Sequence, residues 1–233
     1  MADRTPLILV PGLLCTERLW AHQVEALSDI ADPVVVDHRH HASLTELASS
    51  ILANSPERFA LAGLSMGGYT AMEIIRQAPE RVERVAFLDT SYLADKPEQS
   101  AGRRDVVELA RREGVVTVHE ILIKSWVPDY RLSDESFMAD ARQMAEDTGV
   151  DGFANQQNVI MSRPDSTETL KEIDCPALVL CGKQDMLTPV ELHEEMAHII
   201  PDAELAVIED CGHLSTMERP EAVTKNLIQW INK

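Results

Sequence analysis

The stretch Gly63-Leu64-Ser65-Met66-Gly67 decides how this chain is interpreted. The apolar run 59–64 before the serine predicts a buried strand, and the run 69–75 after it predicts a helix with an apolar face. A serine between glycines at a sharp strand-to-helix turn is typical of a nucleophile elbow. Glycine is required on both sides because the strand end meets the helix start, where a Cβ would clash. We therefore expect the Ser65 hydroxyl to point out of the sheet as a nucleophile.

Short apolar runs, rich in β-branched residues, alternate with helical patterns on both sides of this stretch. Such runs, separated by helices, are typical of a parallel sheet that is covered on both faces. They span residues 7–10, 34–37, 59–64, 84–89, 177–181 and 204–209. The sequence therefore predicts an α/β fold with a doubly wound, mostly parallel sheet of about six strands.

The alternation stops between residues 93 and 171, where no run is typical of a strand. Four amphipathic helical patterns fill this segment instead, at 98–113, 115–126, 134–148 and 152–161. We predict that residues 93–171 form an all-helical cap, inserted over the carboxyl edge of the sheet. Residues 1–92 and 172–233 would then form the α/β core.

The charge and cysteine content exclude several classes of protein. The 233 residues include 21 Lys and Arg against 39 Asp and Glu, which gives a formal net charge of −18. Such a surface repels phosphate backbones and anionic lipids, so we expect no nucleic-acid partner and no membrane partner. No signal-peptide pattern or membrane-spanning run is present. The cysteines lack CxxC spacing and predict free thiols of a cytoplasmic protein: Cys15, Cys175, Cys181 and Cys211.

A serine hydroxyl is a weak nucleophile that needs a histidine base oriented by a carboxylate. In doubly wound folds the carboxyl ends of the strands meet at the edge where ligands bind, so the histidine and the carboxylate are expected just after strand ends. Asp185 follows the fifth predicted strand, and His213 follows the sixth. The order Ser65, Asp185, His213 is the one expected of a catalytic triad on this fold.

Other residues compete for these roles. Asp89, at the end of the fourth predicted strand, is a rival acid, and Asp185 has the alternative role of initiating a turn. Cys15 and Cys211 are alternative catalytic side chains because each lies near a candidate residue in the sequence.

A histidine cluster follows the second predicted strand, at His38, His40 and His41. These residues lack the spacing of known metal motifs, so we expect them to form a solvated loop beside the site. The chain is expected to need no metal and no cofactor.

The tetrahedral intermediate of acyl transfer needs hydrogen-bond donors for its oxyanion. The backbone N–H of Met66, directly after the serine, is one candidate donor. The other is the N–H of Leu13, in the loop that follows the first predicted strand, where Gly12 lets the backbone turn inward.

Four motifs together resemble the α/β-hydrolase superfamily: Val10-Pro11-Gly12-Leu13-Leu14, Gly63-Leu64-Ser65-Met66-Gly67-Gly68, Gly182-Lys183-Gln184-Asp185 and Cys211-Gly212-His213. The chain most resembles the capped branch of carboxylesterases and 3-oxoadipate enol-lactonase-like enzymes. It departs from many members in having Pro11-Gly12 in place of His-Gly, and only about six residues where members have an extra first hairpin. The resemblance implies the strand order 2-1-3-4-5-6.

The residues and the resemblance together predict a serine hydrolase that cleaves a carboxylic ester or lactone of a small, mainly apolar substrate. The candidate pocket residues are Leu14, Trp126, Leu187 and Leu214. The alternatives are a ligand receptor that keeps the triad but turns over very slowly, a C–C hydrolase, and a cofactor-free haloperoxidase. The protein is expected to be a monomer or a homodimer.

Overall fold

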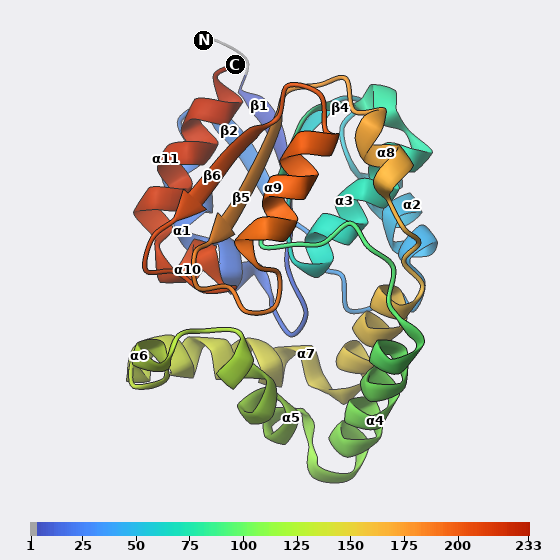
Figure 1. The fold of residues 1–233 in the computed structure, drawn as a ribbon, viewed down its shortest axis with the longest axis vertical. Coiled ribbons are helices and arrows are strands. Elements are labelled where there is room, and N and C mark those ends of the chain that lie inside the picture. The colour runs from blue at the N-terminus through green and yellow to red at the C-terminus, as the bar shows by residue number, and fades with distance from the viewer. Residues whose placement is uncertain (1–3) are drawn as a thin grey trace.

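The predicted strands form one six-stranded sheet in the computed structural model, which describes residues 4–233 (Figure 1). All neighbouring strands pair in parallel, in the order β2-β1-β3-β4-β5-β6. The strands are β1 (Thr5–Val10), β2 (Ala31–Val35), β3 (Phe59–Leu64), β4 (Val82–Leu88), β5 (Ala177–Gly182) and β6 (Glu204–Ile208). The predicted α/β fold and its strand order are confirmed, and β1, which precedes the Leu13 loop, lies beside β3, which precedes Ser65.

Helices cover both faces of the sheet because side chains of a strand alternate between the faces. Leu7 and Leu9 of β1 belong to the apolar cluster beneath α1 (Ala21–Leu27) and α11 (Pro220–Ile231). Ile8 and Val10 belong to the opposite cluster, whose helices are α2 (Leu44–Asn54), α3 (Met66–Gln77) and α9 (Val190–Ile199). Shorter helical elements complete the core: η1 (Glu17–Trp20), η2 (Pro79–Arg81), α8 (Thr167–Lys171) and α10 (Ser215–Glu218).

The segment between β4 and α8 is helical, as expected, and lies beyond the carboxyl ends of the strands (Figure 1). It contains α4 (Pro97–Glu113), α5 (Val115–Leu122), η3 (Ile123–Ser125), α6 (Asp129–Leu132) and α7 (Glu135–Met161). We call these elements the cap helices. α7 spans two of the predicted helices, and Gly149, with φ 68°, interrupts the helical backbone between them. The boundaries of the cap as a domain stay a prediction.

The second strand differs from its prediction. β2 covers Ala31–Val35 instead of 34–37, and it includes Pro33. Proline is tolerated because β2 is an edge strand, whose outer side needs no backbone donor. An edge strand also needs few apolar side chains, so its sequence pattern is weak. Within residues 4–233, no helix is both long and apolar enough to cross a bilayer.

Gly182 marks a close approach between the loops that follow β5 and β6. A Cβ on Gly182 would lie 2.0 Å from the carbonyl oxygen of Gly212 and 2.5 Å from that of Cys211. The N–H of Gln184 donates to the carbonyl of Cys211 at 2.8 Å and joins the same two loops. The side chain of Asp185 is thereby held near that of His213.

We expect Gly182→Ala to lower the free energy of unfolding by about 1–3 kcal/mol or more, because backbone atoms would have to move to admit the methyl group. Gly102→Ala, on α4, is the matched control: no atom lies within 4 Å of its added Cβ. The control should be neutral or stabilise by up to about 1 kcal/mol. Urea unfolding measures both, and equal values for the two variants would contradict the close approach.

Candidate active site

Ser65 lies in the turn between β3 and α3, with φ 55° and ψ −112°. Positive φ is rare for residues other than glycine, so the surrounding backbone must hold this conformation. The Ser65 N–H donates to the carbonyl of Leu88 at 2.9 Å, and its carbonyl accepts from the Thr90 hydroxyl at 2.7 Å. A Cβ on Gly63 would lie 2.2 Å from the carbonyl oxygen of Gly67, so the crowding expected from the sequence is present.

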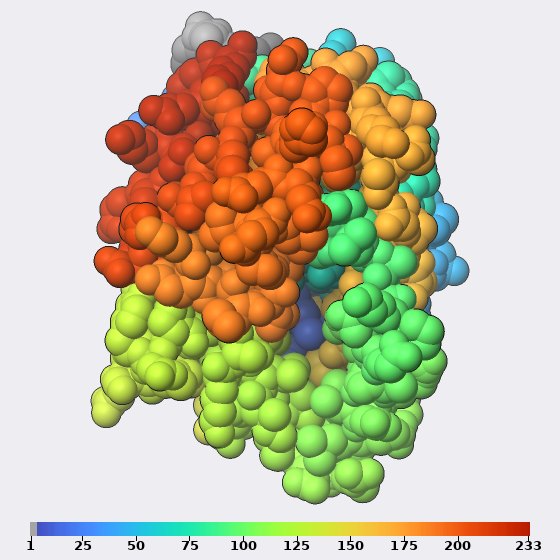
Figure 2. Space-filling view, in the orientation of Figure 1, coloured from blue at the N-terminus to red at the C-terminus, as the bar shows by residue number. Residues whose placement is uncertain are grey.

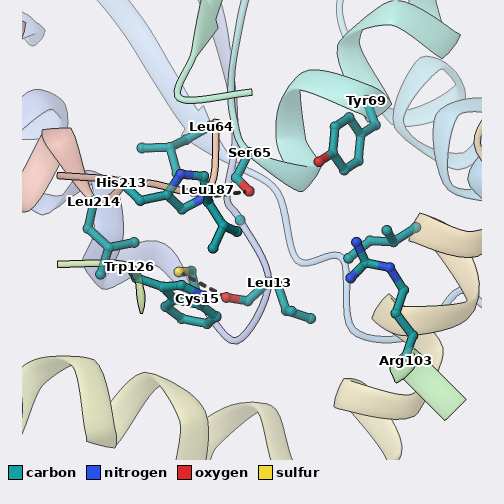
Figure 3. Close-up of a pocket in the computed structure, with 12 residues that line it drawn as sticks. Leu13, Cys15, Leu64, Ser65, Tyr69, Arg103, Trp126, Leu187, His213 and Leu214 are labelled. Atoms are coloured by element: carbon teal, nitrogen blue, oxygen red, sulfur yellow. Dashed lines mark hydrogen bonds between the residues drawn. The ribbon is translucent and has the colours of Figure 1, made fainter. Parts of the chain in front are cut away.

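The structure brings the three predicted catalytic side chains into contact. His213 Nε2 lies 2.8 Å from Ser65 Oγ (Figure 3), and His213 Nδ1 lies 2.7 Å from Asp185 Oδ2. The three residues come from the turn after β3 and the loops after β5 and β6. They form a continuous hydrogen-bonded chain at the carboxyl edge of the sheet.

The charges in this chain stabilise one another despite their burial. Burial alone lowers the pKa of His213, but the charge and hydrogen bond of Asp185 outweigh it, so the pKa is raised above its ordinary 6.5. Burial alone raises the pKa of Asp185, but His213 and Thr188 outweigh it, and the pKa is lowered. An ionised carboxylate can only accept hydrogen bonds, so His213 Nδ1 carries the proton and Nε2 accepts from Ser65.

Asp185 also organises its own loop. Its Oδ1 accepts from the N–H groups of Leu187 and Thr188 at 2.9 and 3.0 Å, and the Thr188 hydroxyl donates to Oδ2 at 2.6 Å. Asp185 therefore has both predicted roles: it forms the turn and it pairs with His213. The turn fixes the carboxylate that faces the imidazole.

Asp89, the rival acid, makes no hydrogen bond to His213 within residues 4–233. Its carboxylate accepts from the N–H groups of Gly182 at 2.9 Å and Ser215 at 3.4 Å. Burial, together with the nearby negative charge of Asp185, raises the pKa of Asp89 well above its ordinary value. Asp89 therefore joins the β5 end to the loop after His213, while Asp185 pairs with the imidazole.

The backbone around His213 is held by a residue that the sequence analysis missed. The buried carboxylate of Glu218 accepts from the N–H groups of Gly212 at 2.9 Å and Leu214 at 3.0 Å. The N–H of His213 itself donates to the carbonyl of Trp126, which follows η3, at 2.7 Å. The residues on either side of His213 in the chain are thus held by the core, and the backbone of His213 itself is held by the cap segment.

The two predicted oxyanion donors are free. The N–H groups of Leu13 and Met66 donate no hydrogen bond within the part of the chain that the structure describes. The next N–H, that of Leu14, is occupied instead: it donates to Gln156 Oε1 on α7 at 2.9 Å, with φ 57° at Leu14. This contact orients the loop from the side of the cap helices.

His38 holds the same loop from the core side. Its side chain is buried, and its Nε2 lies 2.9 Å from the carbonyl oxygen of Gly12. Burial lowers the pKa of His38 to about 4, so the ring is neutral at pH 7 and its Nε2–H donates to the carbonyl. The expected solvated loop is therefore wrong for His38, although His40 is exposed. Residues 4–233 contain no group of three side chains arranged to hold a metal.

All four cysteines are free thiols. Burial raises the pKa of Cys15 to about 12 and raises that of Cys211 as well. Neither thiol is ionised near pH 7, which argues against the alternative of cysteine catalysis.

A cavity of about 40 Å³ adjoins Ser65 and His213 (Figure 3). An outer cavity of about 240 Å³ shares four of its lining residues: Leu13, Arg103, Trp126 and Leu187. Figure 2 shows the opening between the loop after β5 and α4, with the blue N-terminal segment at its base. Its walls include three of the predicted pocket residues: Trp126, Leu187 and Leu214.

Leu14, the fourth predicted pocket residue, does not line the cavity, because its side chain is buried in the core cluster; Leu13 lines it instead. Two polar side chains of the wall, Tyr69 and Arg103, were missed by the sequence analysis. A single arginine on a charged cap helix gives no sequence signal of its own. Tyr69 had such a signal, because it lies one helical turn after Ser65.

The profile of the Alpha/beta hydrolase family matches residues 7–225. The chain belongs to this family. It is 24% identical to pimeloyl-[acyl-carrier protein] methyl ester esterase of Vibrio atlanticus, over 97% of this chain and 94% of that protein.

Among solved structures, this alpha/beta hydrolase is similar to a thermophilic esterase from Thermogutta terrifontis, with 32% identity and a TM-score of 0.90 over 98% of this chain and 89% of that one. It is also similar to the enol-lactonase from Burkholderia xenovorans LB400, with 26% identity and a TM-score of 0.89 over 100% and 93%. These relatives support the prediction of a carboxylic ester hydrolase.

We expect His38→Phe to lower kcat by about tenfold to a hundredfold. The Gly12 carbonyl would lose its hydrogen-bond donor, and the Leu13 N–H would no longer be held in the direction of the oxyanion. KM should change little, since His38 is not part of the cavity wall. Steady-state kinetics on a short-chain p-nitrophenyl ester measures both constants. An unchanged kcat would show that the loop keeps its position without His38.

Proposed function

We propose that this alpha/beta hydrolase cleaves a carboxylic ester or lactone of a small, mainly apolar substrate, with Ser65 as nucleophile. The observation that carries the proposal is the imidazole of His213, hydrogen-bonded to Ser65 on one side and Asp185 on the other. The similarity to an esterase and an enol-lactonase supports the same reaction class.

In the proposed acylation step, Ser65 Oγ attacks the substrate carbonyl while His213 Nε2 takes the hydroxyl proton. Asp185 stabilises the imidazolium that forms. The tetrahedral intermediate then collapses, and His213 returns the proton to the leaving alcohol oxygen as the C–O bond breaks. Ser65 is left acylated. The alcohol of an ester is then free to leave, whereas the alcohol of a lactone stays attached to the acyl chain as a hydroxyl group.

The second step repeats this proton transfer with water. His213 takes a proton from a water molecule, which attacks the acyl carbonyl and releases the acid, and then His213 returns the proton to Ser65 Oγ. The N–H groups of Leu13 and Met66 have no acceptor among residues 4–233 and are the proposed oxyanion donors in both steps. The mechanism uses no cofactor.

The proposed partner is a small-molecule ester or lactone. The walls of the inner cavity are mostly aliphatic or aromatic, which supports a mainly apolar substrate. A cytoplasmic location and a monomeric or homodimeric state stay predictions from the sequence.

We expect Ser65→Ala to lower kcat for a p-nitrophenyl ester by at least about 10⁴-fold, because the variant has no nucleophile. The thermal unfolding temperature should stay close to that of the unchanged protein, since only one oxygen is removed. Residual turnover equal to that of the unchanged protein would refute the role of Ser65.

The same assay separates the alternatives. A receptor would release a single equivalent of p-nitrophenol slowly, whereas an esterase turns over many times. A C–C hydrolase or a haloperoxidase would cleave a panel of esters and lactones poorly but act on its own substrate class in a mass-spectrometric assay.

The pH profile of kcat/KM tests the base. His213 must be neutral to accept the Ser65 proton, and its pKa is raised by Asp185, so activity should fall as pH drops through a value above 6.5. Thermal unfolding measured over the same pH range is the control for loss of fold. An acid limb clearly below 6.5 would contradict a base paired with an ionised Asp185.

A further inference from the structure

Arg103 is the charged side chain of the inner cavity wall on the side away from His213. It extends from α4, it lines both the inner and the outer part of the cavity, and its side chain is 23% exposed. Figure 3 shows its guanidinium directed toward the cavity, facing Ser65 from across the space. A cation in a mostly apolar wall is costly unless a partner compensates it, so its neighbours decide its role.

The neighbours of Arg103 hold it in place without neutralising the site. Asp95 accepts from Arg103 Nε at 2.6 Å and pairs with Arg163 at 2.6 Å as well. Within residues 4–233 neither arginine pairs with another carboxylate, so two positive charges share one negative charge. Asp95 and Arg163 are almost fully buried, which leaves Arg103 as the member of the group that reaches the cavity.

A second partner, Gln157, helps to fix the orientation of the Arg103 guanidinium. Arg103 donates to Gln157 Oε1 on α7 at 3.1 Å, and Gln157 is itself buried. The N–H groups that are not used by Asp95 or Gln157 have no acceptor in the part of the chain that the structure describes. A preorganised guanidinium with free donors binds a planar anion such as a carboxylate well.

Tyr69 adds a second donor on the same side. Its ring packs against the guanidinium carbon of Arg163 at 4.4 Å from the ring centroid, which fixes the ring. In Figure 3 its hydroxyl points into the cavity, on the same side as Arg103, and it forms no hydrogen bond with residues 4–233. One side of the cavity therefore presents a cation and a hydroxyl, while the rest is apolar.

The position of this polar side indicates which part of a substrate would reach it. His213 returns its proton to the leaving alcohol, so the alcohol lies on the histidine side of Ser65. Tyr69 and Arg103 lie on the other side of Ser65 in Figure 3, where we expect the acyl part to extend. Ser65 and Arg103 line the same inner cavity of about 40 Å³, so we expect the acyl chain between the carbonyl and the guanidinium to be short.

We infer that Arg103 and Tyr69 bind a free carboxylate at the end of the acyl part of an otherwise apolar substrate, so that the preferred substrates are half-esters of short dicarboxylic acids. This inference rests on the proposed function, since it assigns the substrate class of the same site. The carbon chain of the acyl part packs against the apolar walls. The protein carries a net charge of −18, so most of its surface repels anions. The positive charge of Arg103 in the cavity wall is therefore what would attract a carboxylate to the site.

The test compares esters that differ only in the terminal group. Monoethyl succinate, glutarate and adipate carry a carboxylate where ethyl butanoate, pentanoate and hexanoate carry a methyl group. Ethanol release, followed with alcohol dehydrogenase, gives kcat/KM for each pair. We expect at least one half-ester to exceed its neutral partner by about tenfold or more, because a charge-assisted hydrogen bond outweighs the desolvation of the carboxylate.

Variants at the site should remove this preference. Arg103→Gln should lower the ratio of half-ester to neutral ester by about tenfold to a hundredfold, mainly through KM. Tyr69→Phe keeps the ring on Arg163 and should lower the ratio by a smaller factor. Arg104→Gln is the matched control, because Arg104 is the exposed neighbour on α4 and, among residues 4–233, its side chain donates only to the carbonyl of Ser100. Its ratio should be unchanged.

The outcomes separate the two proposals. No ethanol from any ester would refute the proposed function itself. Turnover of the neutral esters, with ratios below one in the unchanged protein, would overturn the carboxylate site alone. A loss of activity in Arg103→Gln that is equal for both members of a pair would also overturn it. If that variant does not fold, the ratio of the unchanged protein and the Tyr69→Phe ratio decide.

Discussion

The site depends on how closely backbone segments approach one another at the carboxyl edge of the sheet. At the elbow, the carbonyl of Gly67 occupies the space where a Cβ of Gly63 would lie, and Ser65 is thereby held at positive φ. The loops after β5 and β6 meet in the same way at Gly182 and Gly212. Larger residues would push these segments apart, and the hydroxyl, imidazole and carboxylate would no longer be within hydrogen-bonding distance.

Buried acids reinforce this arrangement because each one binds backbone N–H groups of a loop. Asp185 binds its own turn, Asp89 joins β5 to the start of α10, and Glu218 binds both neighbours of His213. Burial alone lowers the pKa of His213, but the negative charge of Asp185, with smaller contributions from Asp89 and Glu218, raises it above its ordinary value. The groups that hold the loops together therefore also stabilise the charge that the proposed mechanism creates on His213.

The cap helices both support the site and form its walls. The Trp126 carbonyl accepts from the His213 N–H, and Gln156 accepts from the Leu14 N–H, so two loops of the core are held from the cap side. The same helices supply Arg103 and the Trp126 side chain to the cavity. A change of cap sequence would therefore alter the position of the reacting groups as well as the shape of the cavity.

The fold class and the candidates Ser65, Asp185 and His213 could be predicted from the sequence, because strand ends, glycines and turns are short-range patterns. The strand order followed only from the resemblance to a known family. The sequence favoured Asp185 as the acid but left Asp89 as a rival, since both follow strands that end at the same edge. Three facts required the folded chain: Asp185 faces the imidazole, His38 is buried under the Gly12 loop, and Arg103 reaches the cavity. Each of these facts depends on contacts between segments distant in sequence, which packing brings together and local patterns do not encode.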